Sequence, residues 1–411
     1  MSSSAQIGGV TSAQRATSRR VLAVACGAHA LHDGFTDLIY VLLPVWQTEF
    51  ALSYAALGVL RMLFAGAMAG LQVPVSLLAK RLGGPLLLAL GTAIAGGAYL
   101  AIGLTGASFT VLVLALLVGG AGAATQHPIG SSLVAAAYAD TGVRGPLGTY
   151  NFAGDLGKMA LPAATAWLLS LMPWRSALGS IGTLGLVAAV LILLLLPHGA
   201  RIADAANAEP TPPQVEAKRA VQATQSRQRG AFPVLLAIGV LDSGTRMGFL
   251  AFLPFVLKAK GADTPMIGIA LTLIFAGGAA GKLACGWLGA RLGVLRTVLL
   301  TELGTALGIV VLGQVSLPFA LACLPLIGIA LNGTSSVLYG TVPEFVRADR
   351  HAQAFGLFYT GTIGGGAIAP FLYGFAGDAF GPTRAILVVA AVCLLTLPLA
   401  WVLRPSLARR P

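Results

Sequence analysis

Long apolar stretches recur along the whole chain, and short polar or glycine-containing turns separate them. Each stretch has about 20 residues or more, which is the length a helix needs to cross roughly 30 Å of hydrocarbon. The chain is therefore predicted to be an all-α polytopic membrane protein. The pattern predicts twelve membrane-spanning helices, at residues 21–46, 55–79, 84–104, 108–138, 146–171, 175–197, 231–257, 265–290, 294–314, 317–342, 351–376 and 382–403.

One long segment interrupts this pattern, because it is polar, contains several alanines and prolines, and shows no sustained apolar period. We interpret it as a cytoplasmic linker between two six-helix halves. The predicted organisation is a cytoplasmic N-terminal tail (1–20), an N-terminal half (21–197), the linker (198–230), a C-terminal half (231–403) and a cytoplasmic C-terminal tail (404–411).

The two halves carry short repeats of one another. The sequence LLAKRLG at 77–83 aligns with WLGARLG at 287–293, and LLP at 42–44 aligns with FLP at 252–254. Two repeated six-helix halves joined by a central linker resemble the pseudo-symmetric fold of major facilitator transporters. The resemblance implies that a substrate site lies between the halves.

The basic loop between spans 2 and 3, repeated between spans 8 and 9, is also similar to that superfamily. Lys80 and Arg81 belong to the first copy and Arg291 to the second, and these three are predicted as gating-loop residues. The acidic residue usual in this loop is replaced by Lys80 in one copy and by Ala290 in the other.

Composition changes the picture little. The chain is 56% hydrophobic and 10% charged, with a mean hydropathy of +0.85, whereas a soluble chain carries far more charge. The net charge of +12 does not indicate nucleic acid, because Lys and Arg gather on one side of the predicted layout, as in cytoplasmic loops. We therefore expect a bacterial inner-membrane protein with both termini in the cytoplasm. The four cysteines lie in predicted spans without paired spacing, so neither disulfides nor a zinc site is predicted.

The first span places polar residues where lipid is expected. His29, Asp33 and Asp37 are spaced i, i+4 and i+8 and share one helix face, with His32 beside it. A charge inside a bilayer costs at least about 2.5–3.5 kcal/mol, so such residues usually face a cavity and have a function there. Asp33, Asp37 and His29 are predicted to take part in proton coupling, with Asp33 as the proton carrier.

Further polar residues inside the spans are predicted to bind substrate together with His32. They are Arg61, Gln126, His127, Asn151, Asp155, Lys158, Asp242 and Arg246. Lys282 adds another cation, while Glu302 and Asn332 are interpreted as packing groups. Fixed cations in a cavity suit anionic or zwitterionic substrates such as carboxylates or phosphonates.

Structural alternatives stay open for several of these residues. Asp33 and Asp37 could neutralise Arg61 or Lys158 in buried ion pairs. Asp242 and Arg246, spaced i, i+4, could satisfy one another. Gln126 or His127 could bond the backbone carbonyl that Pro128 frees.

Several stretches resemble the fosmidomycin-resistance branch of the major facilitator superfamily. These are HALHDGFTDLIYVLLPVWQTEFALSYAALGVL in span 1, GGAGAATQHPIGSSL in span 4, FAGDLGKMALP in span 5 and GFLAFLPFVL in span 7. An Arg common early in span 7 of that branch is replaced here by Asp242, with Arg246 one turn later. The resemblance implies a proton-coupled transporter, most often an exporter, of small drug-like molecules or metabolites.

The predicted function is export of a small anionic or zwitterionic compound in exchange for protons, with efflux and drug resistance as its consequence. Proton symport that imports an organic anion uses the same residues and stays open. Transport of a divalent metal through His29, His32, Asp33, Asp37 and His127 is a third alternative. No nucleophile–base motif or phosphate loop indicates an enzyme. We expect no cofactor besides the proton gradient, no resident metal, no nucleic-acid partner and a functional monomer.

Overall fold

The computed structural model of the protein describes residues 11–105, 108–197, 231–346 and 350–407, and these residues form helices joined by short turns. The first half contains α1 (Ser12–Asp37), α2 (Ile39–Phe50), α3 (Tyr54–Leu82), α4 (Gly84–Leu104), α5 (Phe109–Ala123), α6 (Gln126–Ala137), α7 (Arg144–Leu171) and α8 (Trp174–Leu195). The second half contains α10 (Ala231–Ala259), α11 (Thr264–Leu292), α12 (Val294–Gln314), α13 (Leu317–Thr341), the short helix η2 (Val342–Glu344), α14 (His351–Phe380), α15 (Pro382–Leu394) and α16 (Thr396–Leu407).

Twelve membrane-crossing segments result, as the hydropathy predicts. Ten segments of the described chain are long and apolar enough to cross a bilayer, with α5 and α6 forming one of them and α15 and α16 another. The α1–α2 segment and α7 are the two remaining membrane-crossing segments. Both contain the polar residues singled out above, which lowers their mean hydropathy.

The helix boundaries differ from the predictions at two kinds of place. Helix α1 starts at Ser12, nine residues before the predicted span, because Thr11 and Gln14 form a capping box that starts it there. Three predicted spans are divided, at Leu38, at 124–125 and at Leu395, and the last two breaks lie four and three residues before Pro128 and Pro398. Proline lacks an N–H and its ring clashes with the carbonyl four residues earlier, so these last two breaks follow from the sequence. The predicted linker 198–230 lies outside the described residues.

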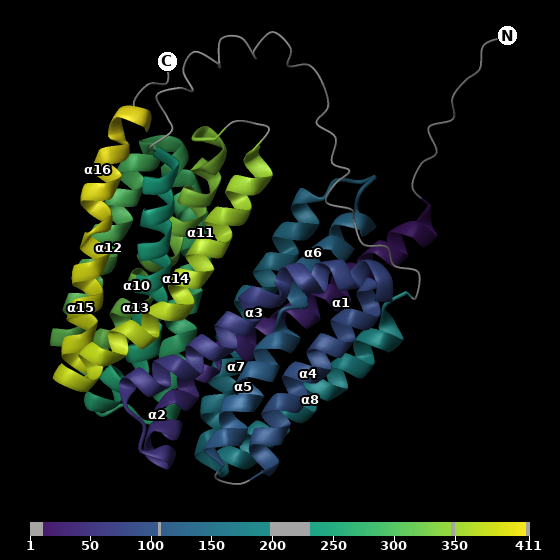
Figure 1. The fold of residues 1–411 in the computed structure, drawn as a ribbon, viewed down its shortest axis with the longest axis horizontal. Coiled ribbons are helices and arrows are strands. Elements are labelled where there is room, and N and C mark those ends of the chain that lie inside the picture. The colour runs from purple at the N-terminus through teal and green to yellow at the C-terminus, as the bar shows by residue number, and fades with distance from the viewer. Residues whose placement is uncertain (1–10, 106–107, 198–230, 347–349, 408–411) are drawn as a thin grey trace.

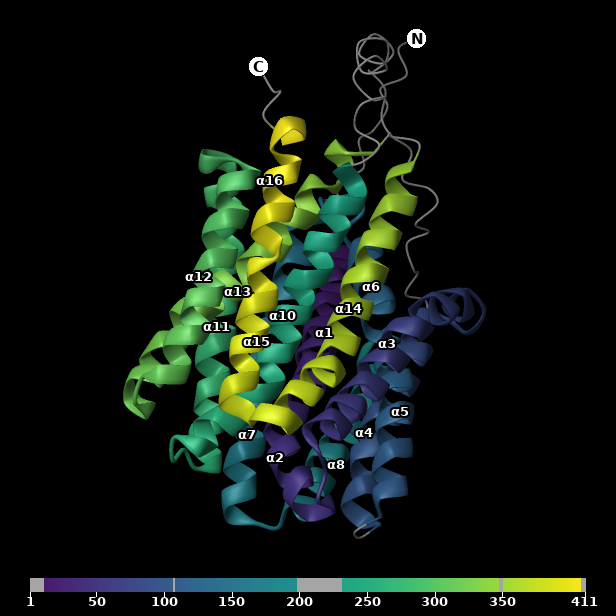
Figure 2. The ribbon, with the colours of Figure 1, turned by 60° about the vertical axis from the view of Figure 1, so that its left-hand side comes forward.

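The two halves form separate bundles that lean against each other (Figure 1). They diverge at the end where α1 begins and α16 finishes, which we call the open end. They meet at the opposite end, around α2, which we call the closed end. Helix α14 runs beside α3 and α11 beside α7, so these helices form most of the contact between halves (Figure 2).

Glycines allow the closed-end helices to approach closely. A Cβ on Gly58 of α3 would lie 2.5 Å from backbone atoms of Phe371 in α14, and one on Gly374 would lie 2.3 Å from Ala55. Such close approach of helix backbones is how membrane helices pack in the absence of a hydrophobic driving force. The closed end is therefore sealed by backbone contact.

Candidate functional site

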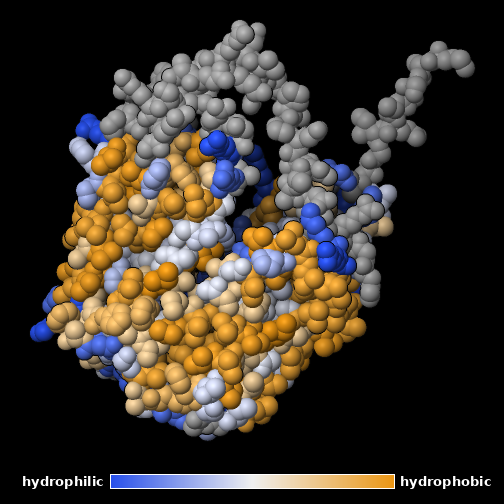
Figure 3. Space-filling model, in the orientation of Figure 1, coloured by the Kyte–Doolittle hydropathy of each residue, from blue (hydrophilic) through white to orange (hydrophobic). Residues whose placement is uncertain are grey.

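A cavity of about 590 Å³ lies between the halves and is lined by α1, α3, α6 and α7 from the first and by α10, α11, α13 and α14 from the second. Figure 3 shows the apolar outer surface of both bundles and the hollow between them. The wall brings together ten residues predicted from the sequence. They are His29, Asp33, Asp37, Arg61, His127, Asn151, Asp155, Lys158, Asp242 and Arg246.

Four cations and four acids line this cavity among the described residues, and they form four pairs. Lys158 Nζ lies 3.3 Å from Asp33 Oδ2, and Arg61 Nη2 lies 3.9 Å from Asp37 Oδ1. Arg246 Nη2 lies 3.6 Å from Asp242 Oδ2, and Lys282 Nζ lies 2.6 Å from Asp155 Oδ1. The ion-pair alternatives considered for the sequence are therefore realised. With neutral histidines and ionised acids, the eight groups sum to zero charge.

Asp33 lies at the centre of a cluster formed by α1, α6 and α7. His29 Nε2 is 3.5 Å, His32 Nε2 3.8 Å and His127 Nε2 3.9 Å from Asp33 Oδ1. Helical spacing places His29 and His32 next to Asp33 on α1, while α6 and α7 bring His127 and Lys158 to it. Asp33 is only 6% exposed, so its carboxylate is largely shielded from solvent.

The tautomer of His29 follows from its second contact. Its Nδ1 lies 2.8 Å from the backbone carbonyl of Tyr150, and a carbonyl only accepts, so Nδ1 carries a proton. The other nitrogen, Nε2, has no hydrogen-bond partner and faces Asp33. A proton placed between His29 Nε2 and Asp33 Oδ1 would satisfy both groups.

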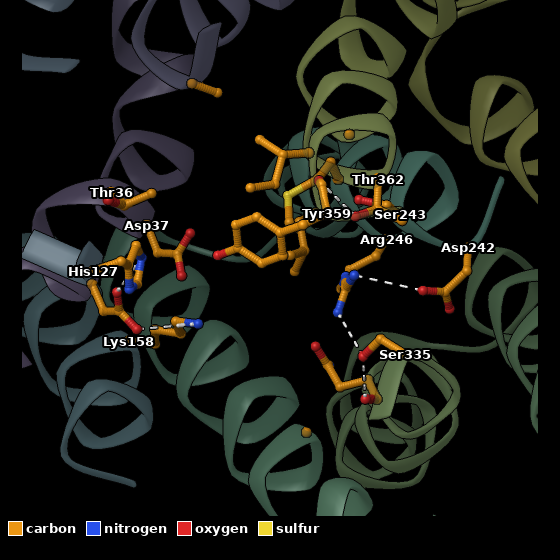
Figure 4. Close-up of a pocket in the computed structure, with 18 of the residues that line it drawn as sticks. Thr36, Asp37, His127, Lys158, Asp242, Ser243, Arg246, Ser335, Tyr359 and Thr362 are labelled. Atoms are coloured by element: carbon orange, nitrogen blue, oxygen red, sulfur yellow. Dashed lines mark hydrogen bonds and ion pairs between the residues drawn. The ribbon is translucent and has the colours of Figure 1, made fainter. Parts of the chain in front are cut away.

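Arg246 forms the corresponding centre in the second half. Besides its contact with Asp242, its Nη1 donates to the Ser335 hydroxyl at 3.4 Å. Figure 4 shows Arg246 facing Lys158 and Asp37 across the cavity, with Tyr359 between the two sides. Cationic groups from both halves therefore face one shared space.

The Asp155–Lys282 pair joins the two halves directly, because α7 carries the acid and α11 the amine. Lys282 Nζ donates to both carboxylate oxygens, at 2.6 and 2.8 Å. Lys282 was recognisable as an intramembrane cation, but nothing in the sequence indicated which acid it would meet. Other cavity-lining residues that the sequence reasoning did not single out are Ser243, Ser335, Tyr359 and Thr362.

Two predicted substrate-binding residues lie elsewhere. His32 and Gln126 line a much smaller space inside the first half, between α1, α4, α5 and α6, and not the central cavity. Gln126 instead forms hydrogen bonds with the Tyr150 hydroxyl. A helical face is about 100° wide, so periodicity alone could not separate His32 from its cavity-lining neighbours.

The predicted gating-loop residues lie at the open end, outside the cavity wall. Lys80 and Arg81 end α3 and Arg291 ends α11, all three being exposed. The Arg291 guanidinium stacks over the ring of Trp287, 4.3 Å from its centroid. Their role in gating stays a prediction.

At the closed end, an acid of the second half caps a helix of the first. Asp378 of α14 accepts hydrogen bonds from the Tyr54 N–H at 2.6 Å and the Ala55 N–H at 3.1 Å. These N–H groups begin α3, where the helix dipole favours negative charge. Nearby, Arg175 donates to Glu49 and lowers the pKa of the exposed Glu49 carboxyl.

The cluster around Asp33 also tests the idea of a metal cargo. Ligand atoms of His29, Asp33 and His127 lie within 4.8 Å of one another, a donor set that suits a divalent ion. However, the Lys158 ammonium contacts the same carboxylate and would repel a cation. The arrangement therefore fits a proton or an anion better than a metal.

Comparison with known proteins places this chain in a family. The family model described as Major Facilitator Superfamily matches residues 25–240 and 234–411. The chain belongs to the major facilitator superfamily. It is thus a multi-pass membrane transporter and not an enzyme, and transporters of this family act on small molecules. A search of curated proteins gave no match.

Solved structures of this superfamily share the fold. A bacterial homologue of the human lysosomal transporter Spinster, described as inward-facing and unoccupied, superposes with a TM-score of 0.78 at 16% identity, covering 96% of this chain and 98% of that one. A mutant of the nucleoside transporter NupG gives a TM-score of 0.74 at 14% identity, covering 94% of this chain and 99% of that one. At these identities the likeness concerns the fold alone.

Proposed function

We propose that this transporter moves a small organic anion, or a zwitterion with an anionic group, in a process coupled to protons. The observation that carries the proposal is the pairing of each cavity cation with an acid. An acid that takes up a proton releases its cation, and a released Lys or Arg can bind a carboxylate or phosphonate.

Asp33 is the proton acceptor that we favour, as expected from the sequence, with His29 and Asp37 assisting. It contacts Lys158, the amine that a proton on Asp33 would release. His29 Nε2 offers a second position for the proton, 3.5 Å away. Proton and anion are thus linked through one side chain, and no further cofactor is required.

The sign of this coupling bears on the direction of transport. A proton and an anion that both favour the unpaired state bind together, which is the behaviour of a symporter. The resemblance to fosmidomycin-resistance transporters supports export in exchange for protons, as in efflux and drug resistance. The ion pairs specifically favour the second candidate, proton–anion symport, because the paired acids leave the cavity without excess positive charge until a proton arrives.

We also propose the orientation. The Lys and Arg distribution favours cytoplasmic termini in a bacterial inner membrane, so the open end would face the cytoplasm. The bacterial Spinster homologue is likewise described as inward-facing. The paired halves supply the whole cavity, in keeping with function as a monomer.

The proposal can be tested in a bacterial host that lacks its main efflux pumps. Wild type, Asp33→Asn and a surface control, Asp140→Asn, would be challenged with fosmidomycin and with anionic and neutral antibiotics. Uptake of labelled organic acids and divalent metals would be measured in parallel. Coupled anion transport predicts that wild type and Asp140→Asn change drug tolerance or the uptake of organic acids. Asp33→Asn should change neither.

Sealed vesicles with an imposed proton gradient then decide the direction. Proton influx that drives anion accumulation indicates symport, and influx that drives anion efflux indicates antiport. Full gradient-driven transport by a correctly folded Asp33→Asn protein would contradict the assignment of Asp33. Transport of divalent metals alone would overturn the anion proposal.

A further inference from the structure

A second acidic site lies in the C-terminal half, behind the cavity wall. The side chains of Asp242 in α10 and Glu302 in α12 lie within hydrogen-bonding reach of one another. They are only 4% and 2% exposed. Two buried carboxyl groups in contact cannot both be ionised at low cost, because like charges about 3 Å apart repel strongly. One proton shared between the two carboxyl groups would remove this repulsion.

The surroundings of this pair are polar but contain little charge. Glu302 Oε2 accepts from the Cys393 thiol and from the Thr396 hydroxyl, both at 3.2 Å. Arg246 is the cation facing the pair, 3.6 Å from Asp242. Cys393 on α15 is a further titratable group in contact with Glu302, and α13 contributes the Thr334 hydroxyl.

A further observation indicates a site built for more than packing. The hydroxyl of Thr245, 1% exposed, lies beside the Cys393 thiol but has no hydrogen bond of good geometry. Thr305, one turn from Glu302 on α12 and 2% exposed, also has an unpartnered hydroxyl. Buried polar groups are normally satisfied, so the Thr245 hydroxyl is available for a different arrangement of protons in the cluster.

The two acids have unequal access to water. Asp242 lines the central cavity, whereas Glu302 does not. A proton that enters from the cavity thus reaches Asp242 first, and Glu302 only through it. Asp242 also contacts Arg246, one of the cations that face the cavity. The pair is therefore placed between the substrate space and a closed interior.

We propose that Asp242 and Glu302 form a second proton-binding site, whose occupancy depends on whether Arg246 is held by Asp242 or by an anion in the cavity. With one shared proton, the two acids and Arg246 together carry no net charge. An anion that binds Arg246 adds one negative charge, and one proton taken up by Asp242 restores neutrality. The role of the anion rests on the proposed function, whereas the shared proton does not.

Infrared spectroscopy of the purified protein tests the shared proton without any substrate. A protonated carboxyl group gives a C=O stretching band that a carboxylate lacks. Glu302→Gln should remove intensity from this band, because Asp242 is then left with Arg246 and ionises. Asp155→Asn is the matched control, since Asp155 is paired with Lys282 and shares no proton. Its protonated-carboxyl band should equal that of wild type.

A second variant keeps the test decisive if Glu302→Gln does not fold. Asp242→Asn leaves Glu302 with a new amide partner, so the band should shift in frequency. Unchanged bands in both variants, each shown to be monodisperse, would overturn the proposal. A loss in Glu302→Gln or a shift in Asp242→Asn, with Asp155→Asn unchanged, would support it.

Proton uptake on addition of fosmidomycin tests the link to the anion. In a weakly buffered solution with a pH-sensitive dye, wild type should take up protons, and Asp242→Asn should take up fewer for the same amount bound. Equal uptake per bound anion in both would refute the link through Asp242. If wild type binds no fosmidomycin while the infrared change is present, the proton site is supported and this substrate is excluded from the proposed function.

Discussion

Replacing Gly58 with alanine should push the closed end of the transporter apart. Gly58 of α3 lies against α14, and a Cβ there would lie 2.5 Å from the backbone N and Cα of Phe371 and from the carbonyl of Pro370. Real Cβ atoms do not approach other atoms so closely. Because the obstacle is helix backbone and not a flexible side chain, one of the two helices has to move.

The size of the effect follows from the cost of overpacking. Extra methyl groups in a well-packed interior typically cost about 1–3 kcal/mol. If the cost arises only while the closed end is closed, the ratio of closed to opened molecules falls about 5- to 150-fold. The better helix propensity of alanine, roughly 1 kcal/mol, acts in both states and cancels from this ratio.

The distance between the halves at the closed end provides the assay. Spin labels on unnatural amino acids at Ser176, near the start of α8, and at Ala259, the end of α10, would leave the native cysteines unchanged. Both positions are exposed. Gly58→Ala should move the distance distribution, measured by pulsed electron resonance, towards longer values.

The matched control is Gly66→Ala, on the same helix. A Cβ on Gly66 would have no heavy atom within 4 Å, so this variant should keep the wild-type distribution. If Gly58→Ala and Gly66→Ala give the same distances, the contact between α3 and α14 does not hold this end closed, and the reasoning is refuted.

Three other contacts give predictions of their own. Asp378→Asn keeps an acceptor for the Tyr54 N–H but loses the negative charge. Because charge-assisted hydrogen bonds contribute about 1.5–3 kcal/mol, the same spin labels should report partial opening of the closed end. An unchanged distance distribution would contradict this. Lys282→Gln and Asp155→Asn should each lower the Tm in detergent, because each leaves the other partner unpaired. The double variant should recover part of this loss, with a coupling free energy of about 0.5–3 kcal/mol. Strictly additive Tm changes would argue against the ion pair. Because the pKa of Glu49 is lowered in the folded state, its contribution to stability is present above its ordinary pKa and is lost as the pH falls through the lowered value. The Tm difference between wild type and Glu49→Gln should therefore vanish on acidification, and a constant difference would contradict it.

The spans could be predicted from sequence because the bilayer imposes their length. Two predicted spans, 84–104 and 294–314, coincide with the helices α4 and α12. Helix breaks inside a span are harder to predict from the sequence, because proline does not always divide a helix. Pro74 and Pro162 lie within α3 and α7, which continue through them. The backbone groups that a proline frees can be satisfied by neighbours that sequence does not reveal.

The polar residues of the site could be recognised individually, but not their partners. Asp33 was predicted to face a cavity, and its spacing from His29 follows from the helix repeat alone. The contact of Asp155 with Lys282 depends on how α7 crosses α11 in the other half. Glu302 was interpreted as a packing or interface group, and its neighbour Asp242 lies 60 positions away on another helix, which the sequence does not reveal.

Pairing changes what the buried charges mean for transport. Counted from sequence, four fixed cations suggested a cavity that suits anionic or zwitterionic substrates. Because each lies against a carboxylate, the cavity is close to neutral, which lowers the cost of burying eight charged groups in the membrane. Binding an anion then requires a cation to leave its acid, and a proton on that acid makes this possible. The pairs that let these charges exist inside the bilayer are thus also a physical basis for linking the proton to the anion.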